Sequence, residues 1–132
     1  MQDPIAHGKA HFMETLGNVP EPIRALIDHA PGYFEGYIKM REHIYREGDG
    51  TGLDLKTKEL IYVVLDIVGG NYDGAENHLQ AGMKAGLTAA EVADACVQII
   101  HAFGVMPWGK GGYRVCDTAL RIEKEMRAKA GG

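Results

Sequence analysis

Cysteine is scarce in this sequence of 132 residues, which contains only Cys96 and Cys116. Two cysteines are too few for a disulfide scaffold, and their separation does not match the ligand spacing of zinc sites. Their simplest interpretation is as small buried apolar residues with reduced thiols. We therefore expect neither a disulfide-rich secreted protein nor a structural zinc protein.

Basic residues are also few, since 14 Lys and Arg stand against 18 Asp and Glu and give a formal net charge of −4. This balance argues against a nucleic-acid-binding protein, which would be rich in Lys and Arg to neutralise phosphates. No apolar run reaches the roughly 20 residues needed to cross a bilayer. The first residues lack the basic-then-apolar pattern of a signal peptide. We expect a cytoplasmic protein with no nucleic-acid or membrane partner.

Strand signals are almost absent, because alternation of apolar and polar residues is not sustained anywhere. Apolar residues make up 45 % and charged residues 24 % of the chain, an ordinary globular balance. The length predicts one domain over residues 1–132. Caps, prolines and glycines predict an all-α domain of six or seven helices. The predicted helices cover about residues 3–17, 20–30, 33–47, 54–69, 72–84, 88–103 and 112–128.

The most apolar of these predicted helices, over about residues 54–69, has little polar face of its own. A helix of that kind is expected to be buried on nearly all sides. A chain of 132 residues cannot easily cover such a helix alone. We therefore expect a homo-oligomer.

Three polar residues interrupt this apolar helix, namely Glu59, Tyr62 and Asp66. They lie at positions i, i+3 and i+7, which places them on one face. Burying a carboxylate without a partner is costly or raises its pKa. The plain explanations are that Glu59 lies in the first turn, where it favours the helix dipole, and that Asp66 pairs with an Arg or Lys across an interface. The alternative is a functional site.

His78 lies on the next predicted helix, beyond the tight turn at residues 69–71. Histidine titrates near neutral pH and suits proton transfer, although most histidines do nothing chemical. Glu59 lies roughly ten residues before the turn and His78 roughly seven after it, so a rise of about 1.5 Å per residue places both at similar heights. We predict that the two side chains face each other across adjacent antiparallel helices.

A second polar stripe follows the Ala-rich helix predicted over residues 88–103, with members Glu91, Asp94, Gln98 and His101. The simplest interpretation is the solvated face of an amphipathic helix. It suits His101 less well than the others, because apolar residues surround that histidine. His101 is then either a hydrogen-bonded core residue or part of a site.

Four segments in order resemble the carboxymuconolactone decarboxylase and alkylhydroperoxidase-D-like family. They are Leu53-Asp54-Leu55-Lys56-Thr57-Lys58-Glu59-Leu60-Ile61, His78-Leu79, Ala85-Gly86-Leu87-Thr88-Ala89-Ala90-Glu91-Val92 and Phe103-Gly104-Val105-Met106-Pro107. The match covers about residues 53–120. The resemblance implies an all-α bundle of six to seven helices of the alkylhydroperoxidase-D-like type. It also implies a homo-oligomer, with a trimer or hexamer expected.

The peroxidase branch of that family carries the pattern E-x11-C-x-x-C-x3-H. Glu59 and His78 have the required spacing, and the two cysteine positions fall at Asn71 and Gly74. Peroxide reduction needs a thiolate nucleophile and a resolving thiol. Thiol peroxidase activity is therefore disfavoured, and the pattern resembles the decarboxylase branch.

The resemblance to that branch implies a cofactor-independent lyase acting on a small carboxylated lactone, or a related intermediate, from aromatic catabolism. His78 would be the acid/base and Glu59 would orient it. Substrate-binding residues in this interpretation are Tyr62, Asp66, His101 and Trp108. The substrate is anionic, and the cations that could meet it are Arg41, Lys110 and Arg114, from the same or a neighbouring subunit.

Two alternatives of other classes stay open. Carboxylate and imidazole ligands suit iron, manganese or zinc, so Glu59, Asp66, His78 and His101 could form a metal site. No short ligand motif supports that hypothesis. The chain could also be a non-catalytic member that keeps only the assembly.

Overall fold

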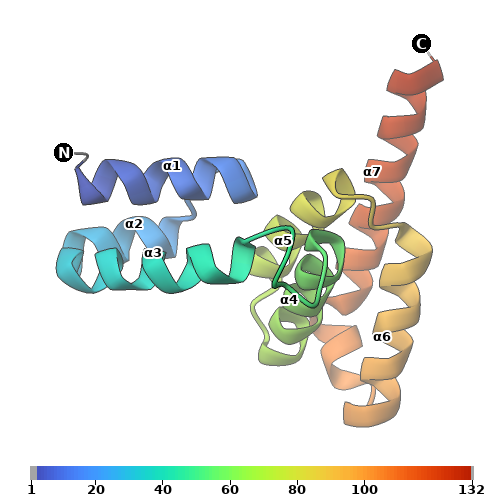
Figure 1. Cartoon of the computed structure of the whole chain (residues 1–132). Coiled ribbons are helices and arrows are strands. Elements are labelled where there is room, and N and C mark those ends of the chain that lie inside the picture. Colours follow the sequence, from blue (N-terminus) through green and yellow to red (C-terminus); the bar gives the residue numbers. More distant parts are fainter. Residues whose placement is uncertain (1–2, 132) are drawn as a thin grey trace. The chain divides into compact units, whose positions relative to one another are not determined.

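The computed structural model describes residues 3–131, and every regular element among them is helical (Figure 1). The predicted all-α class is therefore confirmed. The elements are α1 (Pro4–Leu16), α2 (Glu21–His29), α3 (Pro31–Tyr45), α4 (Leu55–Gly69), α5 (Tyr72–Lys84), α6 (Ala89–Phe103), the π-helix η1 (Trp108–Gly112) and α7 (Tyr113–Gly131). Within the described residues, no helix is long and apolar enough to cross a membrane.

The chain divides into two compact units, Met1–Gly52 and Leu53–Gly132. The second unit begins where the core motif predicted from residue 53 begins. The expectation of a single domain stays a prediction.

The first unit contains α1, α2 and α3. Asp3 caps α1 by accepting a hydrogen bond from the backbone N–H of Ile5, and Gly17 ends it with a positive φ of 81°. The helix α3 begins at Pro31, two residues earlier than predicted, because proline suits the first helical position. Its packing against α1 depends on Gly8, where a Cβ atom would overlap the ring of Phe34.

Arg41 is a buried cation of the first unit, and 5 % of it is exposed. Its guanidinium donates to Thr15 Oγ1 at 2.6 Å and to the Tyr45 hydroxyl at 3.2 Å, and it contacts His11 Nε2 at 3.0 Å. It also lies 4.2 Å from the centre of the Phe12 ring, a cation–π distance. These contacts give Arg41 a structural role within its own unit.

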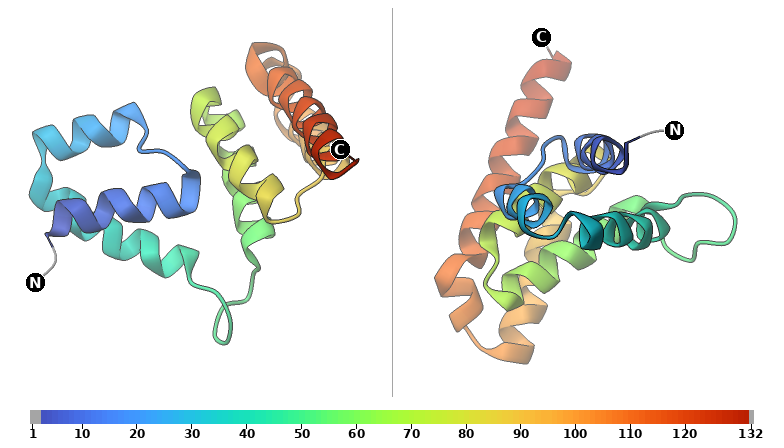
Figure 2. Two further views of the ribbon diagram at one scale, coloured as in Figure 1. Left: turned by 90° about the horizontal axis from the view of Figure 1, so that it is seen from above. Right: turned by 90° about the vertical axis from the view of Figure 1, so that its left-hand side faces the viewer.

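The second unit is built from two helix pairs that pack on each other. Figure 2 shows α4 beside α5 in one layer and α6 beside α7 in the other. Asp54 caps α4, and Thr88 forms a capping box with Glu91 at the start of α6. The hydrophobic core of the second unit lies between the two layers and includes Val63, Ile67, Ala75, Leu79, Met83, Leu87, Val92, Cys96, Ile99, Val115 and Ala119.

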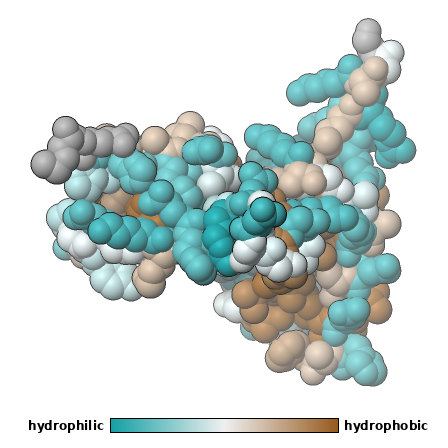
Figure 3. Space-filling model, in the orientation of Figure 1, coloured by the Kyte–Doolittle hydropathy of each residue, from teal (hydrophilic) through white to brown (hydrophobic). Residues whose placement is uncertain are grey.

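This chain alone does not bury the apolar helix on nearly all sides, and burial of the rest by a second copy stays a prediction. Val63 and Ile67 of α4 are each 1 % exposed, but Ile61 and Leu65 are 42 % and 58 % exposed. The layer formed by α6 and α7 covers only one face of α4. Figure 3 shows hydrophobic residues gathered on the surface of the second unit around α4.

The π-helix η1 was not predicted from the sequence. It precedes α7, which begins at Tyr113 where the sequence predicts residue 112. The backbone N–H of Tyr113 reaches the carbonyl of Trp108, five residues earlier, which is the spacing of a π-helix. Gly111 and Gly112 of η1 are buried, and the absence of a side chain lets the backbone approach its neighbours.

Candidate active site

Glu59 of α4 and His78 of α5 meet as the spacing around the turn predicts. Nδ1 of His78 lies 3.2 Å from Oε1 and 3.4 Å from Oε2 of Glu59. The Glu59 side chain is 3 % exposed and that of His78 is 13 % exposed. A carboxylate and an imidazole that are buried and within hydrogen-bonding distance form a pair suited to proton transfer.

Gly82 makes room for this pair. A Cβ atom at Gly82 would lie 3.1 Å from Cβ of Glu59 and 2.9 Å from Cδ2 of Leu87. The backbone of α5 can therefore approach α4 closely at the level of Glu59. The same turn that sets the heights of Glu59 and His78 is closed by Gly70, whose positive φ of 80° favours glycine.

Tyr62 packs on the imidazole of His78. Their ring centres are 4.4 Å apart and the ring planes are inclined by 20°. This stacking restricts rotation of the histidine, while the hydrogen bond to Glu59 selects which ring nitrogen faces the carboxylate. Tyr62 therefore lies against His78, and its contact orients the imidazole, while its role at the substrate stays a prediction.

Asp66 and Asn71 occupy the space around Gly74. The side chain of Asn71 hydrogen-bonds Asp66, and its Oδ1 accepts from the backbone N–H of Gly74 at 3.2 Å. A Cβ atom on Gly74 would lie 2.8 Å from Oδ2 of Asp66. A polar pair thus fills the space beside Gly74, one of the two thiol positions in the peroxidase branch.

Burial raises the pKa of Asp66 above its ordinary value. The charge of His78 and the hydrogen bond from Asn71 oppose that shift. Asp66 is half-buried at the edge of the Glu59–His78 pair. It can therefore hold a proton at a pH where an exposed aspartate has lost it.

Replacing Asp66 with asparagine should stabilise the protein at neutral pH and leave its stability almost unchanged in acid. A carboxyl with a raised pKa in the folded state destabilises the fold above that pKa, and the penalty is absent below its unfolded pKa of about 3.9. We expect Asp66→Asn to raise Tm by a few degrees at pH 7 and by little at pH 3.5. The exposed Asp94→Asn is the matched control. A lower Tm for Asp66→Asn at pH 7 would contradict the assignment.

His101 is exposed on α6, along with Asp94 and Gln98. The solvated-face interpretation therefore holds for His101 too, and the view that its apolar neighbours would bury it is wrong. Of its apolar neighbours, Phe103 is itself exposed (63 %), whereas Ile99 is buried on the other face of the helix (4 %). The structure does not bring His101 to the Glu59–His78 pair.

Trp108 belongs to the π-helix and packs against the core of the second unit. Its ring lies 6.5 Å from that of Tyr113, and Cε3 lies 3.6 Å from where a Cβ of Gly112 would be. These contacts account for Trp108 as a packing residue. A role at the substrate stays a prediction.

The two remaining predicted cations are on the surface. Lys110 is exposed on η1, and Arg114 is exposed on α7. Nε of Arg114 donates to the hydroxyl of its neighbour Tyr113 at 3.0 Å.

The hypothesis of a metal site finds no support in the ligand geometry. In the part of the chain that the structure describes, no three His, Cys, Asp or Glu side chains are grouped so that they could hold a metal ion. His101, the fourth proposed ligand, faces solvent.

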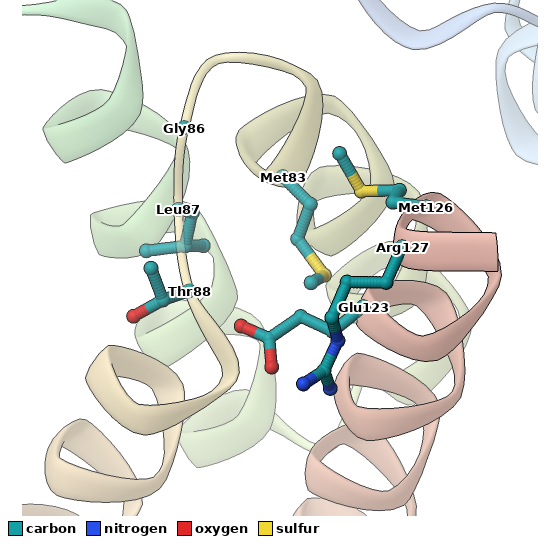
Figure 4. Close-up of a pocket in the computed structure, with 7 residues that line it drawn as sticks. All are labelled: Met83, Gly86, Leu87, Thr88, Glu123, Met126 and Arg127. Carbon is teal, nitrogen blue, oxygen red and sulfur yellow. The ribbon is translucent and has the colours of Figure 1, made fainter. Parts of the chain in front are cut away.

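A pocket of about 380 Å³ is formed by three elements (Figure 4). They are the end of α5, the loop that connects α5 to α6, and the helix α7. The residues that line the pocket are Met83, Gly86, Leu87, Thr88, Glu123, Met126 and Arg127. None of these residues was predicted from the sequence as part of a site, because each has a residue type that is common in amphipathic helices or loops. Oε2 of Glu123 accepts from the backbone N–H of Ala89 at 2.8 Å, so this carboxylate serves the first turn of α6.

Fold and site together define an all-helical protein with a buried Glu–His pair and without cysteines at the motif positions. A profile described as the carboxymuconolactone decarboxylase family matches residues 31–107. The chain therefore belongs to the carboxymuconolactone decarboxylase family. No curated protein matches it.

Among solved structures, the chain is similar to a protein from Burkholderia xenovorans LB400 that is named a putative carboxymuconolactone decarboxylase. The two sequences are 36 % identical, the alignment covers 97 % of each chain, and the TM-score is 0.89. The similarity thus extends over both compact units.

Proposed function

We propose that the protein is a cofactor-independent lyase that removes carbon dioxide from a small carboxylated lactone or a related intermediate of aromatic catabolism. The observation that carries this proposal is the buried pair of Glu59 and His78, 3.2 Å apart. Family membership and the name of the similar structure support the reaction class.

Decarboxylation breaks the bond between a carbon atom and its carboxylate. The electron pair moves toward an adjacent carbonyl and leaves an enolate, which must be stabilised and then protonated on carbon. Carbon dioxide leaves without its proton, so the reaction consumes one proton from the acid. The donor recovers it from water.

His78 is the proposed proton donor. Its Nδ1 faces Glu59, so transfer to the substrate falls to Nε2. Glu59 orients the imidazole through this hydrogen bond. Tyr62 and Asp66 are the proposed substrate-binding residues nearest to His78, and Asp66 carries the raised pKa that a second acidic group needs.

The protein should release carbon dioxide from a carboxymuconolactone. We expect one carbon dioxide per lactone consumed, and one deuterium in the product when the reaction runs in D2O. Treatment with a chelator should leave the rate unchanged. Failure to decarboxylate any lactone in a panel of carboxylated ring variants would favour the non-catalytic alternative.

The decarboxylase assay can also test whether the two cysteines take part in the reaction, because the motif positions carry no cysteine. Cys96→Ser and Cys116→Ser should keep the decarboxylase rate, because neither lies at the motif positions 71 and 74. Peroxide turnover that is lost in either variant would place the chemistry at these thiols instead.

We also propose that the protein is a homo-oligomer, a trimer or hexamer, in which a second copy covers the exposed apolar face of α4. Ile61 and Leu65 are large apolar residues exposed on that face, and contiguous exposed apolar surface marks interaction sites. Sedimentation at micromolar concentration should give the oligomer. Leu65→Glu should shift it toward smaller species without loss of helix content. A wild-type monomer would contradict the proposal.

A further inference from the structure

The only two cysteines in the sequence meet in the folded chain. Cys96 lies on α6 and Cys116 on α7, and their Sγ atoms are 3.5 Å apart. Both thiols are free. Cys96 is 2 % exposed, whereas Cys116 is half-buried and can be reached from solvent. Two thiols twenty residues apart in sequence therefore form a pair in which one thiol is buried and the other is partly exposed.

We infer that Cys96 and Cys116 are a reversible dithiol site that reacts with a small-molecule disulfide and closes to an intramolecular disulfide. This inference is independent of the proposed lyase function. It adds a modification site that the family motif does not place, since the motif positions 71 and 74 carry Asn and Gly.

The geometry favours closure within the chain. A disulfide has a sulfur–sulfur distance of about 2.05 Å, so the sulfurs must approach by about 1.5 Å. Rotation of one side chain and a small shift between packed helices can supply that movement. The two helices already pack against each other, so little conformational entropy remains to be lost. Closure should therefore outcompete reaction of either thiol with a second oxidant molecule.

The two thiols differ in the way that exchange requires. The sulfur–sulfur hydrogen bond with Cys96 lowers the pKa of Cys116, against the opposing effects of burial and of Asp117. The same hydrogen bond and burial raise the pKa of Cys96. The thiolate is the attacking species. Cys116, the more accessible thiol, is thus the attacking residue, and Cys96 is the resolving residue.

The reaction balances in two exchange steps. The Cys116 thiolate attacks one sulfur of the small disulfide, a Cys116–S bond forms, and the other half leaves as a thiolate that takes a proton from water. Cys96 then loses its proton and attacks Cys116 Sγ, which releases the second half as a thiol. Two electrons pass from the cysteine pair to the oxidant, and a dithiol reverses the process.

Closure would link α6 covalently to α7 across the connection that contains η1. That segment includes Val105 and Met106, which are 60 % and 62 % exposed. A cross-link between the flanking helices restricts the unfolded chain and should raise the unfolding temperature of the protein.

Oxidised glutathione is the probe, added to the reduced full-length protein. We expect the chain to lose the mass of two hydrogen atoms with no lasting glutathione adduct. Thiol titration in denaturant should fall from two to zero, and a dithiol should restore both values. The oxidised form should have the higher Tm. A stable glutathione adduct on the wild type, a disulfide-linked dimer, or two unchanged thiols would each overturn the inference.

Single variants separate the two roles. Cys96→Ser should accumulate the mixed disulfide at Cys116, and it should react at least about 10-fold faster than Cys96 does in Cys116→Ser. Cys96→Ala is the matched control, because it removes the hydrogen-bonding group next to Cys116 that serine keeps. It should form the adduct more slowly than Cys96→Ser. Equal rates for Cys116 and Cys96, or for the serine and alanine variants, would contradict the assignment of the attacking and resolving thiols.

Discussion

Replacing His78 with alanine should lower the turnover of the lactone about 10²–10⁴-fold, the usual size of a general acid–base contribution. The variant removes the imidazole that delivers the proton to carbon. The remaining rate would come from binding and from stabilisation of the enolate. The measurement is kcat from initial rates of carbon dioxide release at saturating lactone.

Glu59→Gln should reduce turnover less than His78→Ala, because the amide keeps the shape and can still accept a hydrogen bond from Nδ1. It loses the carboxylate charge that holds the imidazole in place. The double variant should be little worse than His78→Ala alone, since residues that act as one unit are not additive. This pattern distinguishes a working pair from two independent contributions.

The matched control is His29→Ala, which removes an exposed histidine at the end of α2. It should keep the wild-type rate and the wild-type Tm. Wild-type turnover by His78→Ala, or losses that simply add in the double variant, would leave His78 as a packed histidine bonded to Glu59 for structural reasons.

Gly111→Ala should destabilise the second unit by about 1–3 kcal/mol, the usual cost of overpacking a filled site. Gly111 is buried in η1, and a Cβ atom there would overlap the ring of Tyr72. The ring cannot move away easily, because it packs against the core and its hydroxyl reaches the Pro107 carbonyl at 3.5 Å. Thermal unfolding should show a Tm lower by several degrees.

Gly109→Ala provides a control in the same π-helix. A Cβ atom at Gly109 would meet nothing within 4 Å, so this variant should keep or slightly raise Tm. Tyr72→Ala should relieve the overlap, so that Gly111→Ala costs less in that background. Equal Tm values for Gly111→Ala and Gly109→Ala would show that the contact between η1 and α5 is looser than the structure indicates.

Much of the secondary structure follows from local chemistry and is predictable from the sequence. Asp3, Asp54 and Thr88 cap their helices, and Gly17 and Gly70 end theirs with positive φ. These signals work because each cap bonds to a backbone group only a few residues away. The π-helix escaped prediction because the run Trp108–Gly112 contains three glycines and has no periodic pattern of its own.

The pairing of Glu59 and His78 is also predictable, because one tight turn and two regular helices set their heights. The role of the neighbouring residues is not. His101 and Asp66 both look out of place in apolar stretches, yet His101 faces solvent and Asp66 is half-buried beside His78. Which side of a helix the rest of the fold covers is a property of packing, which residue type alone does not determine.

The sequence by itself determined the helical class, most helix ends, the absence of the motif thiols and the juxtaposition of Glu59 with His78. Each of these depends on residues that are close in the chain or separated by one rigid turn. Only the tertiary structure decided that Asp66 and Asn71 fill the space beside Gly74, and that Cys96 meets Cys116. Both arrangements depend on how helices rotate and pack against one another, and the free energy of that packing is summed over many side chains far apart in sequence.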